Sequence, residues 1–172
     1  MTTQELTDLR NSILEGRHQD ALEILDELDE MSRKEIIRKI ESYLIRMLIH
    51  LIKNQIEQRL TNSWAASIRG SIREIKKLNL QDNKTAYYIK VDEWESVINR
   101  VIEDGISDAS VEVLNGAYSP FQLVEMVDRY WVKQKALSLL ALMYEYSPEN
   151  LSRVVNENLL LLPGGEDWKE GK

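Results

Sequence analysis

The stretch IIRKIESYLIRMLIHLIKNQIEQRL, residues 36–60, decides the fold. Its apolar residues recur every three or four positions, which is the period of an α-helix. The remaining positions form a thin polar stripe made of Lys39, Ser42, Arg46, His50, Lys53 and Glu57. A helix that is apolar on most sides needs neighbouring helices on most sides. The stretch therefore predicts a long central helix within an all-α helical bundle.

The residues before this stretch also have a helical period. Gly16 predicts the end of a first helix, because glycine readily adopts the left-handed conformation of a helix C-cap. Residues 20–31 predict an acidic amphipathic helix, with an inner face made of Ala21, Leu22, Leu25 and Leu28. Ser32 and Glu35 have the spacing of a capping box. We therefore expect the central helix to begin at Ser32.

Downstream of the central helix, Trp64 opens a further helix and should lie in the core, packed near Leu48 and Leu51. Residues 94–114 predict another helix. The segment before it, residues 85–91, is rich in β-branched and aromatic side chains, which leaves loop, strand and first helical turn open. A single strand without a partner is unstable, so we favour a loop or a first turn.

Two Ser-Pro pairs, at residues 119–120 and 147–148, have the form of helix starts, with serine as the N-cap and proline at the first helical position. We therefore divide the chain into a helical bundle, a C-terminal helical extension packed on the same core, and a flexible tail. These parts cover residues 1–118, 119–163 and 164–172. Many leucines in the extension suggest self-association or partner binding.

Composition excludes several classes of protein. The 172 residues include no cysteine, so disulfides and thiolate metal sites are absent. With 22 basic and 29 acidic residues the net charge is −7, which repels nucleic acid. No apolar run reaches the roughly 20 residues of a membrane span. The N-terminal residues lack the basic and apolar segments of a secretory signal, so we expect a cytoplasmic protein.

Candidate chemistry is sparse. His50 and Arg46 lie four positions apart and so on one helix face, in a pattern that resembles the pairs of small helical ribonucleases. A second candidate is a basic face that could bind phosphate or an acidic partner: Arg69, Arg73, Lys76 and Lys77. Only Glu15 and His18 have the spacing of a di-iron ligand pair, and Gly16 lies between them, so we expect no metal and no cofactor.

Three runs of sequence resemble a family of small cyanobacterial proteins catalogued as domain of unknown function twenty-nine. The acidic run at residues 25–33 is similar to the family's acidic helix and its turn. Residues 48–53 are similar to its apolar helix with a histidine. Residues 62–64, followed by Ile68 and Arg69, are similar to its serine-tryptophan motif.

The resemblance covers about residues 24–109 and implies an all-helical bundle in a cyanobacterial cytoplasm. It implies no activity, because none is established for the family. After residue 109 the family usually closes with a short tail, whereas this chain continues through two further helical segments.

The function is therefore not disclosed by the sequence. Our leading hypothesis is a non-enzymatic protein-interaction module that binds a protein partner or a second copy of itself. The alternative hypothesis is a small helical ribonuclease or toxin-like enzyme that uses His50 and Arg46. The missing catalytic motifs favour the first hypothesis, so we expect a protein that is not an enzyme.

Overall fold

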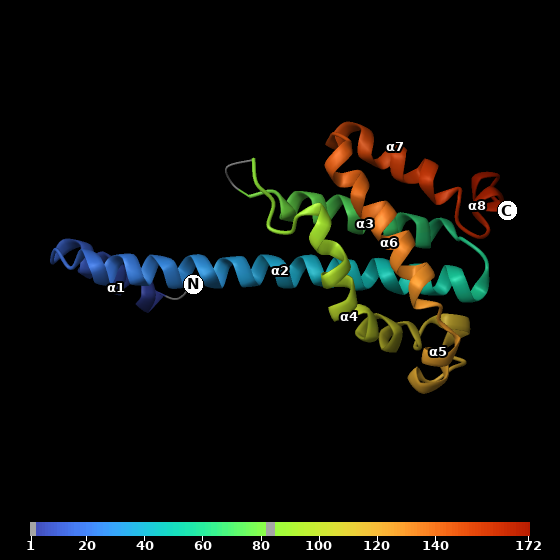
Figure 1. Cartoon of the computed structure of the whole chain (residues 1–172), viewed down its shortest axis with the longest axis horizontal. Coiled ribbons are helices and arrows are strands. Elements are labelled where there is room, and N and C mark those ends of the chain that lie inside the picture. The colour runs from blue at the N-terminus through green and yellow to red at the C-terminus, as the bar shows by residue number, and fades with distance from the viewer. Residues whose placement is uncertain (1–2, 82–84) are drawn as a thin grey trace. The chain divides into compact units, whose positions relative to one another are not determined.

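The chain is built from helices in the computed structural model, which describes residues 3–81 and 85–172 (Figure 1). In chain order the elements are α1 (Thr3–Leu14), α2 (His18–Glu57), α3 (Asn62–Asn79), the 3-10 turn η1 (Val91–Glu93), α4 (Trp94–Ala109), the 3-10 turn η2 (Val113–Asn115), α5 (Pro120–Met126), α6 (Arg129–Glu145), α7 (Pro148–Leu159) and α8 (Gly165–Lys169). The described residues contain no strand, and Leu80 and Tyr87 form an isolated β-bridge. The all-α prediction is confirmed.

The chain divides into two compact units, residues 1–38 and residues 39–172. The division falls within α2, so this helix contributes to both units. From residue 39 onward, the bundle and the C-terminal extension expected from the sequence lie in the second unit.

The first unit is a helical hairpin, in which α1 lies along the first part of α2 (Figure 1). Gly16 adopts a φ of 72° in the turn, as expected for a left-handed C-cap. The Arg17 backbone N–H donates to the Ser12 carbonyl at 2.8 Å, and its guanidinium pairs with both Glu15 and Asp20. These contacts close the turn. Glu15 therefore faces Arg17 rather than a metal-ligand partner.

The expected helix start at Ser32 is wrong, because α2 runs without interruption from residue 18 to residue 57. A capping box stabilises a helix start only where the chain leaves the helix before it. No glycine or proline occurs within α2, and a serine inside a helix costs only a few tenths of a kcal/mol relative to alanine. The acidic helix and the central helix are therefore one helix.

The core of the second unit surrounds the later part of α2. Ile40, Leu44, Met47, Leu48, Leu51 and Ile52 are all fully buried. Gly105 of α4 lies against Leu48, where a Cβ atom would be 3.4 Å from the Leu48 Cβ, an ordinary van der Waals contact. Helix α6 packs against α3, α4 and α7, and α3 also packs against α7. Helices α6 and α7 and the turn after them contribute buried side chains to this core: Leu139, Leu140, Leu142, Met143, Leu159 and Leu162.

Two expected helices are shorter in the structure. The helix over residues 94–114 ends at Ala109, and Leu114 takes a left-handed φ of 46° in η2. The stretch after Pro120 divides into α5 and α6 because the Asp128 side chain accepts the Trp131 N–H and caps a new helix. The N-cap expected at Ser119 is confirmed by a capping box with Gln122.

The segment before α4 is irregular and depends on Asn79. The buried Asn79 side chain accepts the Ile89 N–H at 2.7 Å and donates to the Ile89 carbonyl at 2.9 Å. Tyr144 joins the same network, because its hydroxyl donates to the Ile89 carbonyl and accepts from the Trp94 indole N–H. One buried amide thus replaces the pairing that a second strand would have supplied.

The residues expected to form a flexible tail contain the helix α8. The Trp168 indole N–H donates to the Asn62 side-chain oxygen at 3.1 Å. The fully buried Asn54 amide donates to the carbonyls of Arg59 and Pro163 and so joins the end of α2 to the start of this segment. In the described parts of the chain, no helix is long and apolar enough to cross a bilayer.

Candidate functional site

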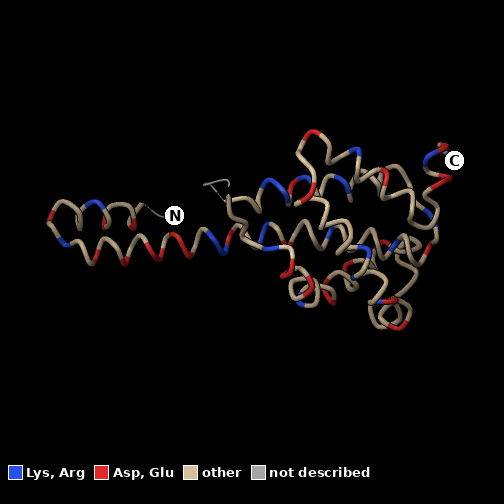
Figure 2. Tube along the Cα trace, turned by 45° about the horizontal axis from the view of Figure 1, so that its top comes forward, with Lys and Arg blue, Asp and Glu red and all other residues tan. Residues whose placement is uncertain are grey.

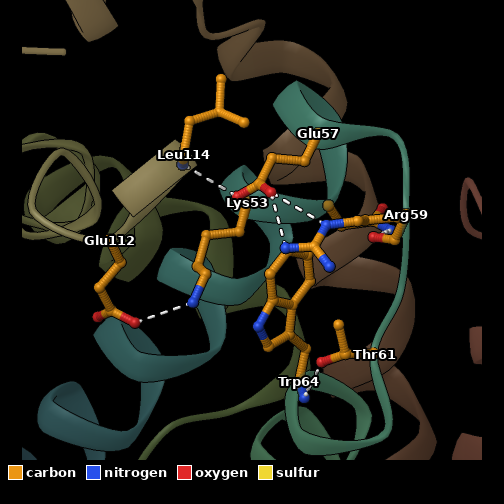
Figure 3. Close-up of polar contacts among 8 residues, drawn as sticks. Lys53, Glu57, Arg59, Thr61, Trp64, Glu112 and Leu114 are labelled. Atoms are coloured by element: carbon orange, nitrogen blue, oxygen red, sulfur yellow. Dashed lines mark hydrogen bonds and ion pairs between the residues drawn. The ribbon is translucent and has the colours of Figure 1, made fainter. Parts of the chain in front are cut away.

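Trp64 lies at the centre of a charged cluster in the second unit (Figure 3). The side chain is 7% exposed, and its backbone N–H donates to the Thr61 hydroxyl, the N-cap of α3. The Lys53 ammonium lies 4.6 Å from the centre of the indole ring, and the Arg59 guanidinium carbon lies 4.7 Å from it. Both distances are within the range of cation–π attraction.

Two carboxylates balance these cations. Lys53 is only 8% exposed, and its ammonium pairs with Glu112 at 3.0 Å. Glu57 binds Arg59 at 3.0 Å through one oxygen and accepts the Leu114 backbone N–H at 3.2 Å through the other (Figure 3). The cluster therefore joins the end of α2, the loop after it and η2. A buried lysine with a carboxylate partner avoids most of the cost of an unpaired buried charge.

His50 lies on the same side of α2, with its ring centre 6.5 Å from that of Trp64. Its Nδ1 atom is buried and has no hydrogen-bond partner among the described residues. Burial, and after it the nearby Lys53 ammonium, lowers the pKa of the His50 imidazole to about 4. The imidazole is therefore neutral at pH 7. A general acid or base works best with a pKa near the working pH, so this environment does not suit catalysis.

The lowered pKa predicts that the protein loses stability in mild acid. In the unfolded chain His50 regains its ordinary pKa of 6.5 and binds a proton that the folded state does not bind. The contribution is complete above pH 6.5 and is lost as the pH falls toward 4. The full shift corresponds to about 3 kcal/mol, and partial exposure to solvent reduces the expected loss to on the order of 1–2 kcal/mol.

Urea unfolding of the protein and of His50→Gln between about pH 7 and pH 4 tests this expectation. Glutamine has no titrating group, so the variant should lose less stability than the original protein over this range. Parallel pH profiles for the two proteins would show that His50 titrates normally in the folded state.

Arg46, the other residue of the suggested ribonuclease pair, is exposed and lies over the Tyr43 ring at 5.3 Å. The two residues of the pair thus have different surroundings, because His50 lies beside Trp64 and Arg46 is exposed to solvent. Leu48 and Leu51, expected beside Trp64, are fully buried. The ring contacts described for Trp64 are with His50, Lys53 and Arg59, polar neighbours that the sequence did not indicate.

The four basic residues of α3 have partners within the chain. Arg69 donates to the Asn156 side chain on α7 at 2.9 Å, and Lys76 donates to the Met143 carbonyl near the end of α6. Arg73 and Lys77 both approach Glu74, at 4.0 and 3.6 Å. Two of the four therefore hold helices together, and binding of an anion by this face stays a prediction.

The hairpin of the first unit carries a different kind of surface, which sequence reasoning missed. Leu22 and Leu25 were expected on the inner face of their helix, yet they are 54% and 46% exposed. Leu6 and Ile13 of α1 are exposed to the same degree, at 49% and 53%. The signal in the sequence was the charge of this segment. Residues 3–31 contain nine acidic and two basic residues, so their net charge of −7 equals that of the whole chain. Figure 2 shows acidic residues recurring along this part of the chain.

Comparison with known proteins identifies the family. Residues 2–132 match the profile of the family described as Domain of unknown function DUF29, which is more than half of the chain, so the chain belongs to this family. The match is longer than the span of residues 24–109 on which the resemblance was based. No curated protein and no solved structure matches the chain.

Proposed function

We propose that this member of the DUF29 family is a non-enzymatic, cytoplasmic protein-interaction module that binds through its N-terminal hairpin. The observation that carries this proposal is the set of leucine and isoleucine side chains left about half exposed on a hairpin with very little core. The buried residues described in the hairpin are Ser12 and Ala21. The short helix α1 and the first part of α2 share so little core that a partner covering their apolar side would stabilise them.

The burial of leucines in the C-terminal extension also favours the hairpin as the interaction surface. Most of them are buried within the second unit, and Leu161 remains 75% exposed as a single residue. Isolated exposed apolar side chains are ordinary on a protein surface. Beyond its leucines the extension also exposes Phe121 on α5 and Tyr130 on α6. The exposed leucine and isoleucine side chains of the hairpin recur at helical spacing on two helices that share little core, so we assign the interaction to the hairpin.

Affinity capture from a lysate of the source cells tests the proposal when it compares three baits. These are the intact chain, the variant Leu6→Gln/Leu25→Gln and the control Leu161→Gln. We expect proteins that the intact chain and the control enrich equally and that the hairpin variant does not enrich. Equal enrichment by all three baits would place the interaction elsewhere or show it to be non-specific.

The alternative function is a small helical ribonuclease that uses His50 and Arg46. The pKa of about 4 for His50 speaks against it, because the imidazole would rarely carry the proton that a general acid must donate at pH 7. Incubation with total RNA separates the two functions. Cleavage that disappears in His50→Ala and persists in His18→Ala would favour the ribonuclease, whereas intact RNA supports the interaction module.

A further inference from the structure

The hairpin formed by α1 and the first part of α2 has two sides that differ in chemistry. On one side, a cavity of about 350 Å³ is lined by residues of both helices, and its five carboxylates are those of Asp8, Glu15, Asp20, Glu23 and Glu27. Helical geometry, at about 100° per residue, places a second set on the other side of the contact between α1 and α2. This set, which we call the apolar face, consists of Leu6, Leu9, Ile13, Leu22, Leu25 and Leu28.

The apolar face is open rather than a covered part of the hairpin core. Four of its six members are about half exposed, and Leu9 and Leu28 are partly covered at the contact between the helices. Its residues recur at spacings of three and four along α1 and at a spacing of three along α2, so each helix presents one stripe. A third helix with its own apolar stripe could lie along the groove between these two stripes, as in a small helical bundle.

Charge decides which kind of helix fits this face. Residues 3–31 carry a net charge of −7, and the remaining residues carry 20 acidic and 20 basic side chains. The exposed carboxylates of Asp26 and Asp29 lie four positions after Leu22 and Leu25, next to the apolar face. Any helix seated on the face therefore has negative charge along its flank.

A second copy of the chain is the less suitable occupant. Two hairpins with seven negative charges each, about 15 Å apart, repel each other enough to weaken association by a factor on the order of 30 at physiological salt. The same charges attract a positively charged helix and increase its rate of association. Complementarity thus favours a basic partner over a homodimer.

We propose that the apolar face binds a basic amphipathic helix of a partner protein, whose apolar stripe covers the leucines and whose lysines or arginines lie beside Asp26 and Asp29. This inference rests on the proposed interaction function and specifies the chemistry of the partner. The bound helix completes a three-helix bundle with α1 and the first part of α2.

The test uses the full chain and two synthetic helical peptides of about 15 residues, long enough to follow α1 from end to end. One peptide has leucines at helical spacing and lysines elsewhere, and the other has the same leucines with glutamates. Fluorescence anisotropy of labelled peptide gives the Kd for each. The protein variants are Leu6→Gln/Leu25→Gln and Asp26→Asn/Asp29→Asn. Their matched controls, exposed residues of the second unit, are Leu161→Gln and Asp104→Asn/Asp108→Asn.

We expect the leucine–lysine peptide to bind and the leucine–glutamate peptide to bind at least about tenfold more weakly. The leucine variant should raise the Kd about tenfold or more, and the aspartate variant should raise it and reduce its dependence on salt. The control variants should leave the Kd unchanged. Far-UV circular dichroism of each variant should match that of the original protein, since all substituted side chains are exposed.

Three results would overturn the inference. The first is lysine-peptide binding that the leucine variant does not weaken, because this would be attraction to acidic surface alone. The second is equal binding of both peptides. The third is a dimer in sedimentation that the leucine variant abolishes, because a second copy would then occupy the face. If lysate capture still depends on Leu6 and Leu25 in these cases, the interaction function stands and only the proposed partner chemistry fails.

Discussion

Replacing Trp64 by alanine should lower the free energy of unfolding of the second unit by about 3–5 kcal/mol. The side chain is 7% exposed, so its removal leaves a large cavity at the start of α3. It also removes the ring that Lys53 and Arg59 both contact, and Lys53 is then left buried with Glu112 as its charged partner. Urea unfolding followed by tryptophan fluorescence measures this change, because all four tryptophans lie in the second unit.

Trp168→Ala is the matched control. This residue is half-buried in the short helix α8, and its described polar contact is one hydrogen bond to Asn62. Its loss should cost on the order of 1 kcal/mol. A change below about 1 kcal/mol for Trp64→Ala would place that side chain at the surface and contradict its assignment to the core.

Replacing Asn79 by alanine should lower the free energy of unfolding by about 2–4 kcal/mol. The side chain is 1% exposed and forms hydrogen bonds with the Ile89 N–H, the Ile89 carbonyl and the Tyr144 hydroxyl. Alanine leaves the buried Ile89 N–H without its acceptor, which costs more than the net value of one hydrogen bond. The same fluorescence-detected urea unfolding measures the effect.

Asn99→Ala serves as the control for Asn79, because Asn99 is exposed on α4 and should cost less than about 0.5 kcal/mol. Tyr144→Phe removes one hydroxyl from the network and should have an intermediate effect. Equal effects of Asn79→Ala and Asn99→Ala would show that the segment before α4 does not depend on the buried amide.

The sequence predicted the class of fold and its main core helix for a simple physical reason. Apolar residues at helical spacing, with few prolines and glycines to end a helix, leave little choice of secondary structure. The cap at Ser119 was also identified, because a serine hydroxyl satisfies free N–H groups at a helix start.

The boundaries were harder to predict, since tertiary contacts decide them. Ser32 and Glu35 match a capping box, but the helix continues through them because nothing in the sequence makes the chain leave the helix before Ser32. Asp128 starts a new helix although the apolar pattern continues across it. The irregular segment before α4 is held by Asn79, and a polar residue on the inner face of a helix gives no sign in the sequence of which carbonyl it will bind.

The candidate sites were affected by the same limit. The polar stripe of the central helix has two different environments in the structure. Ser42 and Arg46 are exposed, whereas Lys53 is buried and pairs with Glu112. Helical periodicity identified the residues of the stripe. Which end of the stripe is buried depends on the packing of the segment around η2, because Glu112 contacts Lys53 and the Leu114 N–H contacts Glu57. The apolar face was missed because a leucine pattern does not show whether a partner helix is present in the chain.

Hydrogen exchange of the full chain, with and without the leucine–lysine peptide, tests the central claim most directly. In the free chain we expect the amides of residues 3–31 to exchange faster than those of α3 and α6, because the hairpin has little core. The peptide should slow exchange in residues 3–31 and leave α3, α4 and α6 unchanged. Slower exchange confined to the second unit, with the hairpin unaffected, would contradict the claim that the hairpin is the interaction surface.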